Sequence, residues 1–139
     1  MSMPEELADC LVLNTVSAAR SLLRRYDARL KPFGVTVQQF SLLGAIRSHP
    51  EEPVALLAQR ISLDRTSLTR NLDLLERKGL VHRLAGPSGN ARFCALTEAG
   101  DTLLDQLVVE WRKAQPGLLT GLSADEIATY LKVARHLAR

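Results

Sequence analysis

The polar side chains best placed to recognise another molecule recur at helical spacing between positions 66 and 77. Because successive helical residues are turned by about 100°, side chains at this spacing share one face of a helix. They are Thr66, Thr69, Arg70, Asp73 and Arg77. Arginine can form two hydrogen bonds to a guanine edge, and threonine can contact a phosphate or a thymine methyl group. The face therefore suits the major groove of DNA, although an ordinary solvated helix face is an equal alternative for this segment alone.

Two short helices joined by a tight turn must position this face. Residues 54–60 carry apolar side chains at helical spacing behind Pro53, a residue suited to the start of a helix because its missing N–H is harmless there. A second helix is predicted over residues 65–78, with Asp64 capping its first turn and Gly79 ending it. Its opposite face should meet the core through Leu68, Leu72 and Leu75. The pair predicts a helix-turn-helix.

The next segment predicts a β-hairpin. An extended run beginning at Leu80 leads to a cluster of turn formers at residues 86–90, and residues 92–96 return as a second strand. Arg83 and Arg92 flank the tip, where they could contact phosphates or the minor groove. A basic hairpin directly after a recognition helix is typical of a wing. The alternative is a structural hairpin that only covers the core.

The net positive charge of the chain is confined to this lobe. Residues 54–97 contain seven basic and three acidic residues, a net charge of +4, whereas the rest of the chain carries −1. A polyanion such as DNA would dock on the segment that carries the excess positive charge. The charge distribution therefore supports the DNA-binding interpretation.

Helices are also predicted on both sides of the lobe. The first spans residues 5–31 and is ended by Pro32 and Gly34; a second begins at a capping box in residues 36–39 and reaches about residue 48. After the hairpin, one helix runs from a cap at Thr97 to about residue 116, and a last one follows a capping box at residues 123–126. The fold class is mainly α, with six helices and one hairpin. The outer helices carry more apolar surface than one compact chain of this size needs to cover itself, so residues 1–33 and 98–139 are predicted to form a dimerisation region. Packing of these helices within one chain is the alternative.

Length and composition limit the remaining possibilities. A chain of 139 residues with 46% hydrophobic content can form one domain over residues 1–139. No apolar run approaches the roughly 18 residues needed to cross a bilayer, and the acidic N-terminus differs from a secretory signal, so a cytoplasmic location is expected. Cys10 and Cys94 lie far apart and the three histidines are scattered, so neither a disulfide framework nor a metal site is predicted. The sequence contains no nucleophile motif and no phosphate-binding glycine loop, and we expect neither an enzyme nor a cofactor.

Three stretches resemble MarR-type transcriptional regulators. They are Gly-Val-Thr-Val-Gln-Gln-Phe-Ser-Leu-Leu-Gly-Ala-Ile (34–46), Leu-Asp-Arg-Thr-Ser-Leu-Thr-Arg-Asn-Leu-Asp-Leu-Leu-Glu-Arg-Lys-Gly-Leu-Val (63–81) and Leu-Thr-Glu-Ala-Gly (96–100). The resemblance covers nearly the whole chain. It implies a homodimeric winged-helix repressor, less often an activator. Many members of the family release DNA when a small phenolic or lipophilic ligand binds between the dimer helices and the DNA-binding lobe. The positions that match DNA-contacting residues of the family are Arg65, Thr66, Ser67, Thr69 and Arg70.

The resemblance also suggests where an effector would bind. Arg20, Tyr26 and Trp111 lie on helices that line the effector cavity of the family, and an arginine beside aromatic rings could hold a carboxylate ligand. Each is equally consistent with core or dimer packing. One branch of the family senses peroxides through a cysteine in the first helix, but the matching position here falls near Val12, about 200° around the helix from Cys10. We therefore predict that Cys10 is a packing residue, and interpret Cys94 in the same way.

The hairpin tip departs from the family pattern. Members usually carry an Asp-Arg-Arg-type tip with an arginine in the minor groove, whereas Ser88-Gly89-Asn90 stands here. The arginine function could have passed to Arg92 or Arg83, or the wing could contribute little. The sequence thus predicts a regulator that binds a palindromic DNA site as a homodimer. The alternative is a winged-helix module that binds a protein and lacks specific DNA binding.

Overall fold

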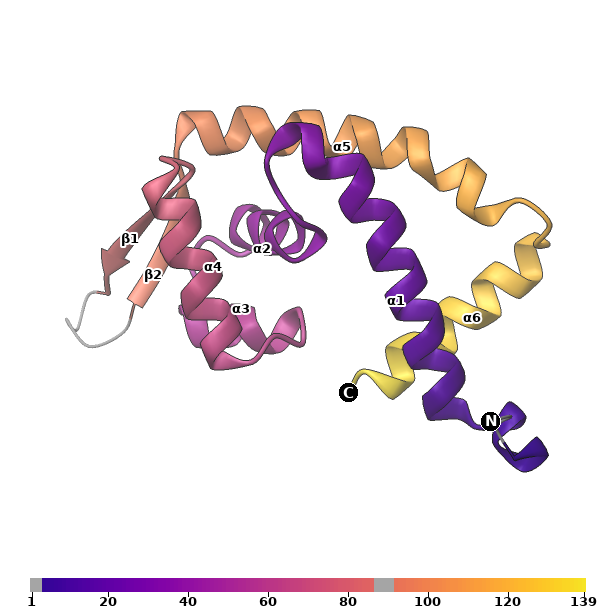
Figure 1. The fold of residues 1–139 in the computed structure, drawn as a ribbon. Coiled ribbons are helices and arrows are strands. Elements are labelled where there is room, and N and C mark those ends of the chain that lie inside the picture. The colour runs from indigo at the N-terminus through magenta and orange to yellow at the C-terminus, as the bar shows by residue number, and fades with distance from the viewer. Residues whose placement is uncertain (1–3, 87–91) are drawn as a thin grey trace. The chain divides into compact units, whose positions relative to one another are not determined.

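The computed structural model describes residues 4–86 and 92–139. The chain divides into two compact units, Met1–Val37 and Gln38–Arg139. Figure 1 labels the helices and strands of both. The first unit contains a 3-10 turn at Glu5–Asp9, helix α1 at Leu11–Leu30 and a second 3-10 turn at Lys31–Phe33. The second unit contains the helix pair and the hairpin predicted to recognise DNA.

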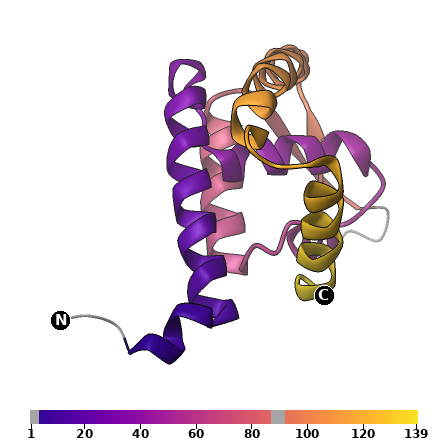
Figure 2. The same cartoon turned by 90° about the vertical axis from the view of Figure 1, so that its right-hand side faces the viewer.

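The N-terminal helix is shorter than predicted. The expected helix over residues 5–31 is interrupted at Cys10, whose backbone is extended with ψ of 120°. The side-chain amide of Asn14 donates to the carbonyl oxygens of Ala8 and Cys10, both at 2.8 Å. The bond to Ala8 satisfies a carbonyl group that a continuous helix would have paired with a backbone N–H, whereas the Cys10 carbonyl also accepts the backbone N–H of Asn14 at 3.1 Å. Figure 2 shows the first turn set at an angle to α1. The predicted end of the helix is confirmed, because Gly34 adopts a left-handed φ of 75°.

Three helices and a hairpin form the compact part of the second unit. Their bounds are α2 Val37–Ser48, α3 Val54–Arg60, α4 Arg65–Arg77, β1 Val81–Ala85 and β2 Arg92–Leu96. The predicted helices at 54–60 and 65–78 and the predicted second strand at 92–96 are confirmed to within a residue. The predicted hairpin is antiparallel, with Val81 opposite Leu96 and Ala85 opposite Arg92. The predicted turn residues 87–90 lie outside the described residues.

Buried leucine and isoleucine side chains hold α2, α3 and α4 together. Leu42, Leu43 and Ile46 of α2 and Leu57 of α3 are at most 1% exposed. Such burial of large aliphatic side chains contributes roughly 1.5–3 kcal/mol each. The helix-turn-helix is therefore held by its own apolar core.

Two longer helices complete the second unit. They are α5 at Glu98–Leu119 and α6 at Ala124–Leu137. The hydroxyl of Thr97 caps α5 by accepting from the backbone N–H of Gly100 at 3.0 Å. The capping box predicted at residues 123–126 is confirmed at the start of α6. In Figure 1, α5 leads away from the hairpin and α6 follows after a sharp turn.

The predicted end of α5 near residue 116 is wrong. Pro116 lies inside the helix, which continues to Leu119. A proline removes one backbone hydrogen bond, and this one does so only three residues before the helix ends. The Thr120 hydroxyl then donates to the Pro116 carbonyl oxygen at 3.1 Å, and Gly121 turns the chain with φ of 87°. None of the helices in the described part of the chain is long and apolar enough to span a bilayer.

Candidate nucleic-acid interface

The first turn of α4 is fixed by the carboxylate of Asp64. One oxygen of this carboxylate accepts the backbone N–H of Ser67 at 2.8 Å, and the other accepts the Ser67 hydroxyl at 2.9 Å. The backbone bond, followed by the hydroxyl bond, lowers the pKa of Asp64 below its ordinary value. The predicted N-cap is therefore confirmed. Because the hydroxyl proton of Ser67 is used within the protein, Ser67 is a weaker candidate than its threonine neighbours to donate to a phosphate.

The two faces of α4 differ as the sequence predicted. Leu68, Leu72 and Leu75 are buried, with exposures of 4%, 3% and 0%. The opposite face is exposed along the helix, and it carries Arg65, Thr66, Thr69, Arg70, Asp73 and Arg77. We call α4 the recognition helix and this row of side chains its polar face. The apolar face anchors the recognition helix and leaves its polar face open to a partner.

A buried polar contact fixes the recognition helix against α2. The amide of Gln39 donates to the Asn71 side-chain oxygen at 3.2 Å. The Asn71 amide donates to the Gln38 side-chain oxygen at 3.3 Å and to the Ser67 carbonyl oxygen at 2.9 Å. Because an unpaired buried amide is costly, these bonds favour one rotation of α4 about its axis. Sequence reasoning did not identify Asn71, although a polar residue within the arc of buried leucines is the signal that could have found it.

The arginines of the polar face are not held by carboxylates of the described residues, in contrast to Arg47 and Arg60. Arg60 pairs with Glu52 at 2.5 Å, and Arg47 is also held by carboxylates. Arg65 and Arg70, in contrast, are exposed and form no ion pair with any described residue. Two unpaired guanidinium groups beside two threonine hydroxyls can therefore bind phosphate oxygens or base edges directly.

The two predicted wing arginines lie in different surroundings. Arg92 is exposed at the start of β2 and forms no ion pair with any described residue. Arg83 in β1 is instead held by two carboxylates of the recognition helix, Asp73 and Glu76. The sequence did not predict this arrangement. The tip residues 88–90, which depart from the family pattern, lie outside the described residues.

The base of the hairpin is joined closely to the start of α5. The Thr97 hydroxyl donates to the Gly79 carbonyl oxygen at 2.6 Å, and the Thr97 N–H donates to the Leu80 carbonyl oxygen at 3.1 Å. Gly100 is buried against the same segment, so closely that an added Cβ would lie 2.1 Å from the Leu80 carbonyl oxygen. Gly79, which ends α4, has the left-handed φ of 73° that the sequence predicted. The Leu-Thr-Glu-Ala-Gly stretch thus fastens α5 to the end of the recognition helix.

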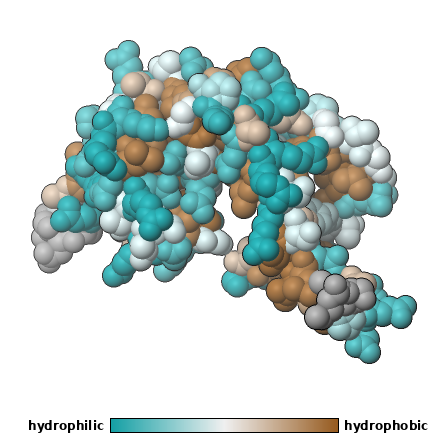
Figure 3. Space-filling view, viewed as in Figure 1, coloured by the Kyte–Doolittle hydropathy of each residue, from teal (hydrophilic) through white to brown (hydrophobic). Residues whose placement is uncertain are grey.

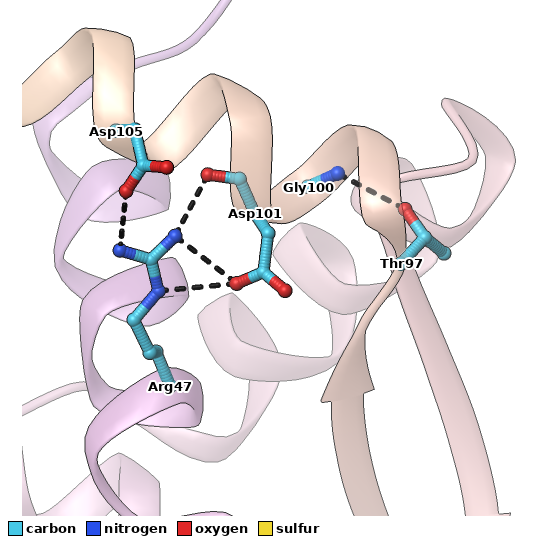
Figure 4. Close-up of polar contacts among 5 residues, drawn as sticks. All are labelled: Arg47, Thr97, Gly100, Asp101 and Asp105. Carbon is cyan, nitrogen blue, oxygen red and sulfur yellow. Dashed lines mark hydrogen bonds and ion pairs between the residues drawn. The ribbon is translucent and has the colours of Figure 1, made fainter.

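An arginine of α2 makes a second link to α5. The Arg47 guanidinium contacts the carboxylates of Asp101 at 3.0 Å and Asp105 at 2.8 Å, and it also donates to the Asp101 carbonyl oxygen at 2.7 Å (Figure 4). The bond to Asp105 is the main cause that raises the pKa of Arg47. Exposed pairs of this kind contribute little individually, and a network contributes more. Arg47 and the Thr97 junction together place α5 firmly on the helix-turn-helix.

The three predicted effector residues lie on two helices. Arg20 is exposed and Tyr26 is half-buried on α1, whereas Trp111 is 39% exposed on α5. Burial raises the pKa of Tyr26 above its ordinary value, and the charge of Arg29 opposes this effect. Six residues along a helix turn the side chain by about 240°, so Arg20 and Tyr26 project from different sides of α1.

The two cysteines occupy different environments. Cys94 is 3% exposed in β2, and burial raises the pKa of its thiol to about 11. This agrees with the prediction that Cys94 is a packing residue. Cys10 is half-buried at the break before α1. Both thiols are free.

The arrangement defines the class of protein. A capped helix with an open polar face, held on two other helices and followed by an antiparallel hairpin, is a winged helix-turn-helix. Comparisons with known proteins identify the family. Residues 33–91 match the model of the MarR family. The uncharacterized HTH-type transcriptional regulator YhbI from Bacillus subtilis (strain 168) is 30% identical over 111 residues, which are 79% of this chain and 72% of YhbI. The chain belongs to the MarR family of transcriptional regulators.

Solved structures agree with this assignment. The transcriptional regulator MosR of M. tuberculosis, in complex with DNA, is 34% identical with a TM-score of 0.76, and the match covers 93% of this chain and 98% of MosR. A mutant MarR from E. coli, complexed with operator DNA, is 26% identical with a TM-score of 0.83, covering 96% of this chain and 99% of that one. Members of the family are transcriptional regulators and not enzymes, as the sequence predicted. The resemblance found in the sequence is thus confirmed, as is the mainly helical winged-helix fold.

Proposed function

We propose that the protein binds a palindromic operator as a homodimer and represses transcription from it. The observation that carries the proposal is the polar face of the recognition helix, where Arg65 and Arg70 have no carboxylate partner among the described residues and stand beside Thr66 and Thr69. One recognition helix from each protomer would enter the major groove, with the two half-sites about one DNA turn apart. Structures of MosR and E. coli MarR with DNA support the choice of partner.

Each side chain of the polar face has a proposed role. Arg70 lies further along the helix than the cap and can reach a guanine edge, whereas Arg65, in the first turn, is suited to a phosphate. Thr66 and Thr69 would contact phosphates or thymine methyl groups. Ser67 contributes through the Asp64 cap. Arg92 is the candidate for a wing contact with the DNA backbone, because it is exposed on the hairpin.

Exposed apolar side chains support the homodimer. Of the large hydrophobic residues that are exposed in the described part of the chain, all but Leu56 and Leu84 lie in residues 1–33 or 98–139. The view in Figure 3 shows part of this hydrophobic surface in brown near the N-terminus. The exposed large hydrophobic residues within residues 1–33 and 98–139 are Leu7, Leu11, Val12, Leu13, Val16, Leu22, Leu23, Val109, Trp111, Leu122, Tyr130, Leu131, Val133 and Leu137. A second copy would cover such surface, since monomeric proteins rarely leave large apolar patches exposed.

Selection of bound sequences from random duplex DNA tests the proposal. The purified protein should enrich one palindrome. In a plot of the logarithm of its affinity against the logarithm of the salt concentration, the slope should be nearly −1 for each neutralised phosphate. Feeble binding without sequence preference would contradict the proposal and favour a winged-helix module that binds a protein.

Sedimentation of the free protein tests the homodimer and should give twice the mass of one chain. Leu131→Glu should shift it toward the monomer, and Leu56→Glu, outside the dimerisation region, should not.

A small phenolic or lipophilic molecule is the proposed class of effector, held by Arg20, Tyr26 or Trp111. An arginine can bind the carboxylate of such a molecule, and an aromatic ring can cover its apolar part. Because Arg20 and Tyr26 project from different sides of α1, each is a separate candidate. Titration of the operator complex with a simple phenolic acid such as 4-hydroxybenzoate should release DNA. The Arg20→Gln variant should need more of the acid while binding DNA normally. If the variant and the wild type release DNA at the same concentration of the acid, Arg20 is not part of the proposed pocket.

For a regulator of this kind, we infer that the cytoplasm is the site of action.

A further inference from the structure

The wing is attached to the recognition helix through one arginine. The Arg83 guanidinium in β1 forms an ion pair with the Asp73 carboxylate of α4. Its Nε atom lies 3.8 Å from a carboxylate oxygen of Glu76, one turn further along α4. The same arginine thus faces two carboxylates that project from the helix proposed to enter DNA.

A backbone contact adds a second point of attachment. The Arg83 N–H donates to the other Glu76 carboxylate oxygen at 3.2 Å. Glu76 therefore holds the main chain of β1, while Asp73 holds the end of the Arg83 side chain. Two attachments to one strand restrict both its distance from α4 and its rotation, which a single contact would not do.

Burial separates Arg83 from the arginines of the polar face. The Arg83 side chain is 22% exposed, compared with 52% for Asp73 and 45% for Glu76. Its Nε atom is buried and has no hydrogen-bond partner among the described residues. The hydrogen bond to Asp73 is the main cause that raises the pKa of Arg83, so its charge is permanent. The bond to Asp73 uses only one of the five N–H donors of the guanidinium, so the burial of Arg83, rather than a shortage of donors, limits the access of a phosphate.

We propose that Arg83 is a positioning residue, which fixes the angle between the wing and the recognition helix and does not itself bind DNA. The proposal rests on the proposed function, because the angle matters only if both elements meet one duplex. The proposal also explains why Asp73 and Glu76 stand on a helix proposed to enter DNA. Carboxylates beside a phosphate backbone would weaken binding by repulsion, and here they serve as anchors for the wing.

Removal of one carboxylate separates positioning from direct contact. If Arg83 only contacted a phosphate, Asp73→Asn would remove a repulsive charge, free the arginine and leave DNA affinity unchanged or higher. If Arg83 positions the wing, Asp73→Asn should weaken operator binding roughly fivefold, and Arg83→Met should weaken it about tenfold. The double variant should resemble Arg83→Met alone, because both changes remove the same attachment. The proposal would be overturned if the fold losses of affinity in the two single variants multiply in the double variant. It would also be overturned if Asp73→Asn binds as tightly as the wild type.

The salt dependence of binding gives a readout that lost stability cannot imitate. Loss of a phosphate contact reduces the log–log slope by about one unit, whereas loss of a positioning residue leaves the slope unchanged. We expect the wild-type slope in Arg83→Met and a reduced slope in Arg65→Ala, because Arg65 is the arginine proposed to bind a phosphate. A reduced slope in Arg83→Met would show that Arg83 contacts DNA. Asp105→Asn is the matched control, since it removes an ion-paired carboxylate on α5 and should leave affinity unchanged.

Hydrogen exchange of the free protein tests the attachment without DNA. The amides of β1 should exchange faster in Asp73→Asn and Arg83→Met than in the wild type or in Asp105→Asn. Unchanged exchange would refute the attachment. If the wild type selects no DNA sequence while the exchange result holds, the proposed function fails and the attachment stands. If the wild type binds its operator and the exchange or affinity result fails, only the positioning role is lost.

Discussion

Substitution of Gly100 by alanine tests the junction between the recognition helix and α5. An added Cβ would lie 2.1 Å from the Leu80 carbonyl oxygen, whereas ordinary contacts begin at 3.4 Å. The two segments must therefore separate by about 1.3 Å. The obstacle is backbone, so no side-chain rotation can relieve it. The same carbonyl oxygen accepts the Thr97 N–H at 3.1 Å, and the separation would weaken this bond as well.

The expected cost follows from these two effects. Overpacking costs about 1–3 kcal/mol, and a lost hydrogen bond about 1 kcal/mol, which gives about 3 kcal/mol in the free energy of unfolding. With an unfolding entropy of about 2.1 cal/mol/K per residue, the melting temperature of this 139-residue chain should fall by about 10 °C. Thermal unfolding followed by circular dichroism, at one fixed protein concentration, measures this change.

A second glycine provides the control. Gly44 lies inside α2, and a Cβ added there would meet nothing within 4 Å. Gly44→Ala should raise stability by up to about 1 kcal/mol, because alanine is the better helix former. A Gly100→Ala variant that melts at or above the wild-type temperature would refute the close approach. Equal losses in the two variants would also refute it.

Three further predictions concern the recognition helix and the cysteines. Arg70→Ala should weaken operator binding by about 1–3 kcal/mol, more than Arg92→Ala, and a DNA titration that gives equal or reversed losses would contradict this order. Iodoacetamide at pH 8 should label Cys94 far more slowly than Cys10 in the folded protein, because the Cys94 thiol is buried and becomes largely ionised only near its pKa of about 11. Mass spectrometry measures the labelling of both cysteines. Rapid labelling of Cys94 would be inconsistent with its burial. The Asp64 cap lowers the pKa of that carboxyl in the folded state, so its stabilisation is present above the unfolded pKa and is lost as the pH falls through the lower folded value. The melting temperatures of the wild type and Asp64→Ala should therefore differ at pH 7 and converge near pH 2, and a constant difference would exclude the charged cap as its cause.

Local signals in the sequence predicted the recognition helix well. The cap at Asp64, the leucine arc of α4 and the left-handed Gly79 each depend on residues within one or two helical turns. Their geometry is therefore readable from spacing alone. The polar face follows from the same periodicity, because burial of the leucines on one side leaves the other side exposed.

Contacts between distant segments were not predictable in the same way. Arg83 was expected to face DNA, and its two carboxylate partners depend on how the hairpin docks on α4. The need for glycine at position 100 arises from a backbone segment 20 residues earlier in the chain. The break at Cys10 depends on the side chain of Asn14, which competes with the helical hydrogen-bond pattern. Tertiary packing decides such features, and a single sequence carries little record of it.

The most direct test of DNA recognition by α4 is to repeat the selection from random DNA with the Arg70→Ala variant. If the polar face enters the major groove, the variant should lose its preference at one base pair in each half of the palindrome and keep the preferences elsewhere. A variant that enriches the same palindrome with unchanged preference at every position would show that Arg70 reads no base. That result would contradict the proposed role of the polar face.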